Sequence, residues 1–316
     1  VLEVGIGGRY DATSAVDPVA SAVTSVSLEH TELLGDTVEE IARDKAQVAP
    51  TDGPLVTGAT GDALDAIRTV TDVVAVGPDD ADVIAVEHGM DRAIESNVSI
   101  TGPTWSLETN LQLLGQHQAE NAGVAATLAR QVADVPTSDI AAGLRQATLP
   151  GRFEILDSDP MAVLDGSHNP GAMSTLSTTL ERFDYDDLRV VFGAMADKDH
   201  AAMVDALPPV ETAFVTEPGV DRAESADTLA TVFEGHAAEV TRIPSVPEAT
   251  ERALSAADPD DFVLVTGSLY AVAEARDRWT RLLVPRDGGR PPSEHGALDA
   301  AAFPETVPGD VDHHVL

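Results

Sequence analysis

Residues 162–170 read AVLDGSHNP, and this stretch decides the fold of the second half of the chain. Residues 162–164 form a short apolar run of the kind found in buried strands. The next six residues are rich in turn and helix-cap formers, so the strand is expected to pass through a tight turn into a helix. A strand, a turn and a helix in this order form the repeating unit of a parallel sheet.

The same alternation continues on both sides of this stretch. Further strands are predicted at 189–192, 212–215 and 262–265, with helical segments between them, which favours a largely parallel, Rossmann-like sheet with helices on both faces. The first half follows the same α/β pattern. There we predict strands at 22–27, 54–57 and 73–76, and helices at 38–48, 62–70, 116–130 and 138–146.

The chain is predicted to contain two domains and a tail. The turn at Leu149-Pro150-Gly151 precedes a strand-like run, so we place the boundary after residue 149. The first domain is then 1–149 and the second, smaller one is 150–285. Residues 286–316 are rich in Gly, Pro and acidic residues, which is typical of a linker or disordered tail. With 316 residues and 43% hydrophobic content, both domains can bury a core.

The composition is strongly acidic. Asp and Glu outnumber Lys and Arg 54 to 19, and a net charge of -35 argues against nucleic acid or an anionic membrane as a partner. The chain has two lysines, Lys45 and Lys198, while Asp is abundant throughout. This pattern indicates a surface adapted to high salt, and the alternative is an acidic surface that binds a partner; salt-dependent folding separates the two.

The chain has no cysteine and no transmembrane run. Disulfides and Cys-ligated zinc are therefore excluded, and a metal must use oxygen or imidazole ligands; a cytoplasmic location is compatible with this. No apolar run approaches the ~20 residues that span a bilayer. The first residue is Val1, and residues 1–4 read as the end of a buried strand. We therefore expect an upstream part, including any targeting signal.

Two residues near the start are candidate metal ligands. Glu3 lies at the end of a predicted strand that leads into a glycine-rich turn. That turn does not match the dinucleotide-binding motif G-x-G-x-x-G, because Tyr10 stands where the motif needs its last glycine. His30 ends the next predicted strand, at the same sheet edge, where α/β folds bind ligands. The alternatives are a solvent-facing carboxylate and a structural histidine.

Lys45 is a candidate for amine chemistry. Thr37 and Glu40 have the spacing of a capping box, and the helix they begin carries Lys45 near its end. In a chain with two lysines, one at this place suggests a need for an amine rather than for positive charge.

Several sequence blocks now support a family resemblance. Residues 2–13, LEVGIGGRYDAT, resemble the LEVGLGGRLDATN segment of folylpolyglutamate and dihydrofolate synthases, which belong to the Mur ligase superfamily. The resemblance continues in family order through HTELLG (30–35), IARDKA (41–46), HQAENA (117–122), PGRFE (150–154), LDGSHNP (164–170), VFGAMADKD (191–199) and VTGSLY (265–270). It implies that 1–149 is the remainder of a P-loop-type ATPase domain, and that 150–285 is the Rossmann-like Mur ligase C-terminal domain.

The resemblance also implies roles for individual residues. By it, Glu3, His30 and a carbamylated Lys45 ligate Mg²⁺, and the carbamate changes a cation into an anionic oxygen ligand. The implied ATP contacts are Asn121, Arg152, Asp165 and His168, and Arg152 reaches the phosphates when the domains close. Tyr10, Asp11 and Ala12 are the implied pterin contacts. Cap formation is the alternative for Asp11 and for the turn at 165–170.

The implied activity is an ATP-dependent amide ligation. A folate or dihydropteroate carboxylate attacks ATP to give an acyl phosphate, and L-glutamate then displaces phosphate; family members are usually monomeric. No G-x-x-x-x-G-K-[ST] loop occurs in these residues, so we expect a fragment of a longer protein, inactive alone. Relatives in salt-loving archaea suggest a fused pteroate synthase domain. The alternatives are another Mur-type ligase and a non-catalytic nucleotide- or folate-binding module.

Overall fold

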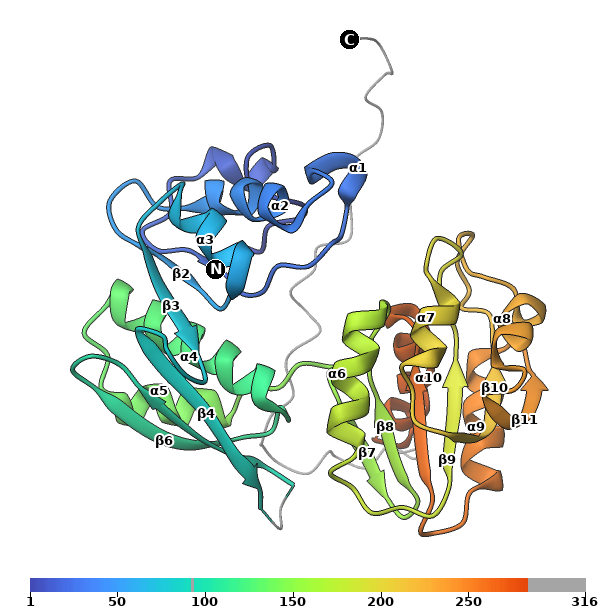
Figure 1. Ribbon diagram of the computed structural model, residues 1–316. Helices are drawn as coiled ribbons and strands as arrows, with labels where there is room; N and C mark the ends of the chain where they lie inside the picture. Colours follow the sequence, from blue (N-terminus) through green and yellow to red (C-terminus); the bar gives the residue numbers. More distant parts are fainter. Residues whose placement is uncertain (92–93, 284–316) are drawn as a thin grey trace, which may run out of the picture. The chain divides into compact units, whose positions relative to one another are not determined.

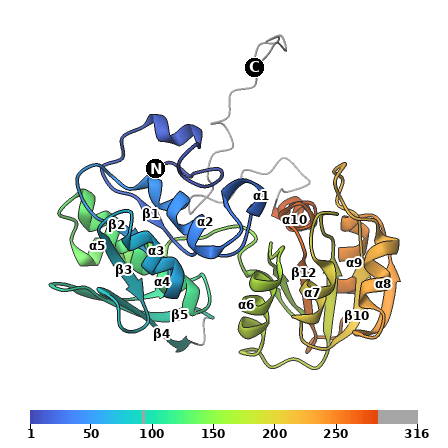
Figure 2. The ribbon, with the colours of Figure 1, turned by 45° about the horizontal axis from the view of Figure 1, so that its top comes forward.

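A computed structural model describes residues 1–91 and 94–283, and in each half of the chain a six-stranded sheet forms (Figures 1 and 2). Both sheets are mixed but mostly parallel, and helices cover them. The predicted α/β class is therefore confirmed. The tail predicted at 286–316 lies outside the described residues.

The first sheet has the strand order β1-β2-β3-β4-β5-β6. Strands β1 to β4 run parallel, and β4, β5 and β6 pair antiparallel. The strands are β1 (Ala22–Val23), β2 (Leu55–Thr57), β3 (Val73–Gly77), β4 (Val83–Met90), β5 (Ser96–Thr101) and β6 (Ser106–Leu111). The helices of this half are η1 (Ala12–Ala15), α1 (Thr31–Leu34), α2 (Val38–Lys45), η2 (Ala46–Val48), α3 (Gly61–Arg68), α4 (Gln116–Val132) and α5 (Thr137–Arg145).

Helices cover both faces of the first sheet because its central strands are apolar on both sides. Leu55 packs into a cluster with α2 and α3, while its neighbour Val56 packs into a cluster with α4. Successive side chains of a strand point to opposite faces, so these two clusters lie on opposite faces of the sheet.

The second sheet has the order β11-β10-β9-β12-β8-β7, and its strands are parallel except for β7. The strands are β7 (Glu154–Ser158), β8 (Met161–Leu164), β9 (Leu188–Phe192), β10 (Val210–Val215), β11 (Ala237–Arg242) and β12 (Phe262–Thr266). The helices are α6 (Pro170–Leu180), α7 (His200–Asp205), α8 (Ala226–Phe233), α9 (Val246–Ala256) and α10 (Leu269–Leu283). Helices α6, α7 and α8 share one core cluster with the sheet, and α9 packs on β9, β10 and β12.

The structure corrects two predictions about strands and adds four strands that were not predicted. Residues 1–4 form no strand, and Val1 and Leu2 are exposed; in the described residues β1 is the edge strand, so they have no strand beside them to pair with. The strand predicted at 22–27 is two residues long. Strands β4, β5, β6 and β11 were not predicted; the sequences of β5 and β6 are largely polar, and burial alternates along β5 because one of its faces packs on the core.

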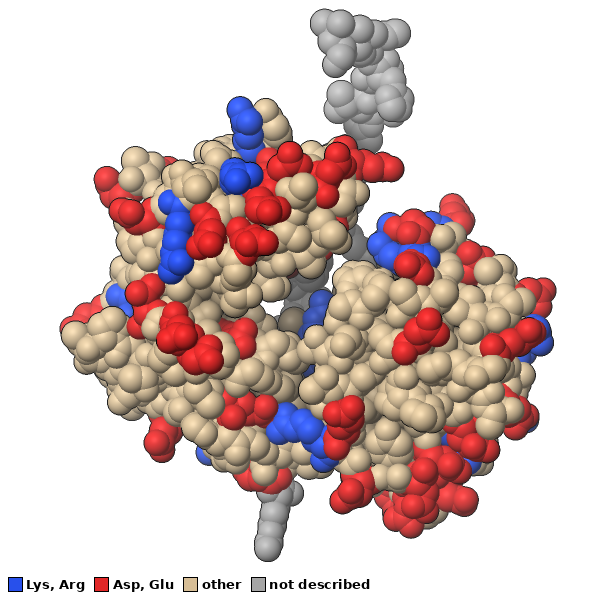
Figure 3. Space-filling model, viewed as in Figure 1, with Lys and Arg blue, Asp and Glu red and all other residues tan. Residues whose placement is uncertain are grey.

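Acidic side chains are spread over the face of the molecule in Figure 3, among fewer basic ones. That face shows no single acidic patch, and the adaptation of the surface to high salt stays a prediction. Within the described part of the chain, no helix combines the length and the apolar character needed to cross a membrane.

A partly buried ion pair anchors β9 in the second sheet. Arg189 Nε donates to Asp261 Oδ2 at 2.8 Å, and the same oxygen accepts the Asp258 N–H at 2.9 Å. Burial alone raises the pKa of Asp261, but the hydrogen bond from the Asp258 N–H and the Arg189 guanidinium together hold that pKa below its ordinary value. The side chain of Asp261 is 3% exposed, and that of the more distant Asp187 is 47% exposed.

We expect Asp261→Ala to lower the free energy of unfolding by about 3 kcal/mol, because it leaves Arg189 partly buried without its main carboxylate. The matched control is Asp187→Ala, which removes an exposed partner of the same arginine and should cost at most about 1 kcal/mol. Urea unfolding in molar KCl measures both. Equal costs would contradict the assignment of Asp261 as the anchoring carboxylate.

Candidate functional site

Two carboxylates hold the glycine-rich loop at 5–8. Asp11 Oδ2 accepts the N–H groups of Gly5 and Ile6 at 3.0 and 3.2 Å, and Asp44 Oδ1 accepts the Gly8 N–H at 2.9 Å. Asp11 Oδ1 also caps η1 by accepting from the N–H and hydroxyl of Thr13. These hydrogen bonds lower the pKa of Asp11 to about 2, and the one from the Thr13 hydroxyl contributes most. Asp11 therefore shapes the loop, as the cap interpretation expected.

The other two predicted pterin contacts flank this cap. Tyr10 is 83% exposed, and the Arg9 guanidinium lies 5.0 Å from the centre of its ring. Ala12 begins η1 and is also exposed. Both residues are accessible to a ligand on the surface of the loop that Asp11 organises.

Lys45 lies at the end of α2 and pairs with the residue before His30. Its Nζ is 2.9 Å from Glu29 Oε1, and the side chains are 19% and 41% exposed. His30 has a left-handed backbone with φ of 50° and is the residue directly before α1, and Glu3 is exposed. Among residues 1–91 and 94–283, no three His, Asp or Glu side chains gather into a metal-binding group. The structure brings Lys45 to the residue before His30, and Glu3, His30 and Lys45 all stay metal ligands by prediction only.

Arg152 lies in a turn whose backbone is held in an unusual conformation. The residues on either side, Gly151 and Phe153, both have positive φ, at 70° and 44°. Left-handed backbone is unfavourable for a bulky residue such as Phe153, so the surroundings must hold it. The Phe153 ring stacks on Phe183 with ring centres 5.4 Å apart, and its N–H donates to Asp165 Oδ2 at 2.9 Å.

Asp165 joins the end of β8 to that turn. Its carboxylate is buried and accepts three hydrogen bonds: one from the Phe153 N–H at Oδ2, and two from the N–H and hydroxyl of Ser167 at Oδ1. The Gly166 N–H donates to the Gly151 carbonyl at 2.8 Å, and His168 Nδ1 contacts the Gly166 carbonyl at 2.9 Å. Arg152, Asp165 and His168 are therefore brought together at the carboxyl end of β8.

Asn121, the fourth predicted nucleotide contact, lies on α4. It is exposed, and its amide donates to Gln118 one turn earlier at 3.2 Å. Its side chain can therefore exchange this exposed contact for a ligand at little cost.

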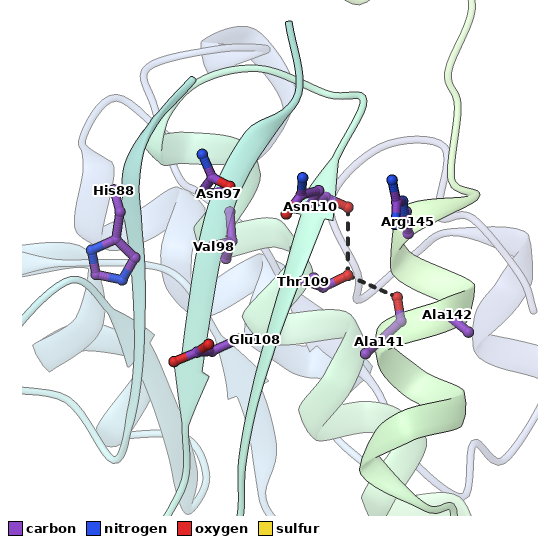
Figure 4. A pocket seen from close by; sticks show the side chains of 9 residues that line it. All are labelled: His88, Asn97, Val98, Glu108, Thr109, Asn110, Ala141, Ala142 and Arg145. Carbon is purple, nitrogen blue, oxygen red and sulfur yellow. Dashed lines mark hydrogen bonds between the residues drawn. The ribbon is translucent and has the colours of Figure 1, made fainter. Parts of the chain in front are cut away.

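The described residues line two cavities of different character. A groove of about 590 Å³ lies over β4, β5, β6 and α5, and one of its polar side chains, Thr109, donates from Oγ1 to the Ala141 carbonyl at 2.9 Å (Figure 4). As far as the described residues show, its lining includes no predicted site residue. The second cavity, of about 450 Å³, is lined in part by Arg152, Glu154 and Arg276. The second cavity is the one connected with the predicted chemistry.

Sequence reasoning missed two residues at the site. Glu29 pairs with Lys45, and Glu154 accepts the Gly151 N–H at 3.0 Å. Glu29 directly precedes His30, the first residue of the block HTELLG, and Glu154 ends the block PGRFE, two residues after Arg152. A search for charged neighbours of the selected residues would have found both.

The parallel sheet and the turn that gathers Arg152, Asp165 and His168 define a class of protein. Residues 151–269, which span these three residues, match the family model described as "Mur ligase, glutamate ligase domain". Residues 151–269 are therefore identified as a Mur ligase glutamate ligase domain.

The relatives narrow this class to one family. The chain is 56% identical over 315 residues to a probable bifunctional folylpolyglutamate synthase/dihydropteroate synthase from Halobacterium salinarum, covering 98% of this chain and 38% of the relative. It is 31% identical over 288 residues to the dihydrofolate synthase/folylpolyglutamate synthase of Escherichia coli, covering 88% of this chain and 64% of that protein. The structure of E. coli FolC with DHPP and ADP matches with a TM-score of 0.78 and 27% identity, over 89% of this chain and 66% of that one. This chain belongs to the folylpolyglutamate synthase/dihydrofolate synthase family.

We expect Asp165→Asn to lower the free energy of unfolding by about 1–3 kcal/mol without any nucleotide present. Asparagine has one acceptor oxygen where the Asp165 carboxylate has two, so a buried N–H that now donates to the carboxylate loses its acceptor. Ser167→Ala is the matched control: it removes one donor, leaves the carboxylate in place and should cost at most about 1 kcal/mol. Calorimetry of the nucleotide-free proteins in high salt measures both. An Asp165→Asn variant as stable as the unsubstituted chain would rule out a structural role for this carboxylate.

Proposed function

We propose that this chain forms part of an ATP-dependent amide ligase that adds L-glutamate to a folate or dihydropteroate carboxylate. The observation that carries the proposal is the turn that gathers Arg152, Asp165 and His168 within a matched glutamate ligase domain. The structure of E. coli FolC with DHPP and ADP supports it, because this chain matches that structure over 89% of its own length.

The proposed reaction needs no protein nucleophile. A substrate carboxylate oxygen attacks the γ-phosphorus of ATP and ADP leaves, which gives an acyl phosphate. The amine of L-glutamate then attacks the acyl carbon, and phosphate leaves as the amide forms and the amine loses a proton. The protein therefore acts by positioning the substrates and by neutralising phosphate charge.

The nucleotide contacts are proposed from what each side chain can offer. Arg152 offers a planar guanidinium that suits phosphate oxygens and lines the cavity of about 450 Å³. A carboxylate oxygen can accept two hydrogen bonds, so Asp165 Oδ2 can accept a nucleotide hydroxyl in addition to the Phe153 N–H. His168 and the exposed Asn121 complete the set.

We also propose that Glu3, His30 and a carbamylated Lys45 hold a divalent cation. With a carbamate on Lys45, these residues offer oxygen and imidazole nitrogen atoms as metal ligands. The Lys45 amine lies 2.9 Å from the carboxylate of Glu29. A carbamate at Lys45 would place two anions together, and a bound divalent cation would offset that repulsion. When bound, the cation would neutralise charge on the ATP phosphates. The structure of the bifunctional folylpolyglutamate synthase/dihydrofolate synthase from Yersinia pestis is a complex with AMPPNP and Mn ion, and we propose Mg²⁺ here.

Tyr10, Asp11 and Ala12 are proposed to contact the pterin. The exposed ring of Tyr10 can stack on a flat heterocycle, and the loop that carries it is fixed by Asp11 and Asp44. Either dihydropteroate or a folate offers a carboxylate to the same chemistry, so the acceptor has to be determined by assay.

We further propose that the protein is a monomer, that it works in the cytoplasm of a salt-adapted cell, and that its domains are 1–149 and 150–285.

This chain spans 38% of the length of the Halobacterium relative and 64% of that of the E. coli relative. No phosphate-binding G-x-x-x-x-G-K-[ST] loop occurs in its 316 residues, so we propose that they have little activity alone.

The test uses a protein extended upstream to include a phosphate-binding loop, called here the extended protein. We expect it to release ADP in molar KCl with Mg²⁺, and the release should require L-glutamate and either dihydropteroate or tetrahydrofolate. These 316 residues alone should release little. Release with a different acid or amino acid would indicate another Mur-type ligase. Nucleotide binding without release under any condition would indicate a binding module.

We expect Lys45→Ala to reduce ADP release by about a hundredfold or more, because it removes both the amine and its carbamate. Lys45→Arg is the matched control: it keeps a cation beside Glu29 but cannot be carbamylated, so it should be as inactive as Lys45→Ala while staying as stable as the unsubstituted protein. Mass spectrometry under native conditions adds a direct readout of a carbamate. Full activity of Lys45→Arg would overturn the role of the amine.

A further inference from the structure

Glu154 is the first residue of β7, and its carboxylate connects the turn of Arg152 to helix α10. Its Oε2 accepts the Gly151 N–H at 3.0 Å, and Arg276 Nε lies 3.0 and 3.1 Å from its two oxygens. The side chains of Glu154 and Arg276 are 18% and 42% exposed. One carboxylate thus joins a backbone N–H of the turn to a side chain of the helix.

Helix α10 provides a fixed support for this contact. The Ser268 hydroxyl accepts the Ala271 N–H at 3.1 Å and donates to the Gly193 carbonyl at 2.7 Å, which attaches the start of the helix to the sheet. Arg276 follows Ser268 by two turns of the same helix. Since the helix is anchored at its start, Arg276 presents its guanidinium at a defined place.

The turn itself is packed against α10 at a glycine. A Cβ on Gly151 would lie 2.9 Å from Val272 Cγ1, and Gly151 is buried with φ of 70°. A buried N–H must have an acceptor, and for Gly151 that acceptor is the Glu154 carboxylate. The turn has little freedom to move once this bond is made.

We propose that Glu154, held by Arg276, is a positioning residue that fixes the Gly151–Phe153 turn and so aims the Arg152 guanidinium at the nucleotide phosphates. The inference rests on the proposed function in taking Arg152 as a nucleotide contact. Arg276 is 42% exposed, and an ion pair to a partly exposed arginine stabilises a fold by little, so we assign the main effect of the Glu154–Arg276 pair to the geometry of the turn. Guanidinium–phosphate hydrogen bonds are directional, and a misplaced turn weakens them.

The test measures equilibrium binding of a fluorescent ADP analogue to the extended protein in molar KCl. Glu154→Ala should weaken binding about tenfold, the value of one well-aligned charge-assisted hydrogen bond. Glu154→Gln keeps an acceptor for the Gly151 N–H, so it should recover most of the affinity. The matched control is Glu274→Ala: Glu274 is also on α10 and accepts the Gly219 N–H at 2.6 Å, but that turn does not carry Arg152.

A double-mutant cycle separates positioning from general structural support. If Glu154 acts through Arg152, Glu154→Ala should have no further effect on ADP affinity in an Arg152→Ala background. Independent, multiplying losses would overturn the inference, as would unchanged affinity in Glu154→Ala. Calorimetry checks folding, and if Glu154→Ala does not fold, Arg276→Gln takes its place in the cycle, with a smaller expected loss of about threefold.

Failure of the inference and failure of the ligase are distinguishable. An unsubstituted protein that binds the analogue but releases no ADP would contradict the ligase, and the variants would still decide the role of Glu154. A folded unsubstituted protein that binds no ADP analogue would overturn both.

Discussion

The buried carboxylate of Asp165 is the contact on which the candidate nucleotide site depends. It lies at the carboxyl end of β8 and holds the Phe153 N–H, which keeps a bulky residue in left-handed backbone. That conformation determines where the preceding residue, Arg152, projects. The same carboxylate orders the turn into α6 through Ser167, so strand, turn and helix share one acceptor. If Asp165 contacts the nucleotide as proposed, its substitution changes folding as well as binding.

The parts of the fold that could be predicted are those whose signals are local. Thr37 caps α2 by accepting the Glu40 N–H, and Asn169 caps α6 by accepting the Ala172 N–H, so both helix starts follow from the sequence. The antiparallel strands β4 to β6 could not be predicted in this way. In β5 a polar residue such as Ser96 is buried, because its hydroxyl donates to Glu87 on the neighbouring strand. That partner is known only once the strands are paired.

The same distinction applies to the site. The block PGRFE identified Arg152, but its position depends on Asp165, which is thirteen residues away, and on Arg276, which is more than a hundred residues away. Cap formation was the alternative for the turn at 165–170, and the structure shows caps and a gathered site in the same residues. The sequence therefore indicated which residue types matter, whereas the supporting contacts required the fold. The metal ligands are the opposite case, since Glu3 is exposed and its role rests on resemblance.

The two lysines show why charge alone does not explain Lys45. Each pairs with a carboxylate at 2.9 Å, Lys45 with Glu29 and Lys198 with Asp197, and an arginine could make either pair. Lysine differs in that its amine can lose a proton and react with carbon dioxide. In the proposed site, a carbamate on Lys45 would face the carboxylate of Glu29, and the two anions would repel each other. A divalent cation bound there would offset this repulsion. We therefore propose that carbamylation of Lys45 and metal binding are coupled, so that each is favourable mainly in the presence of the other.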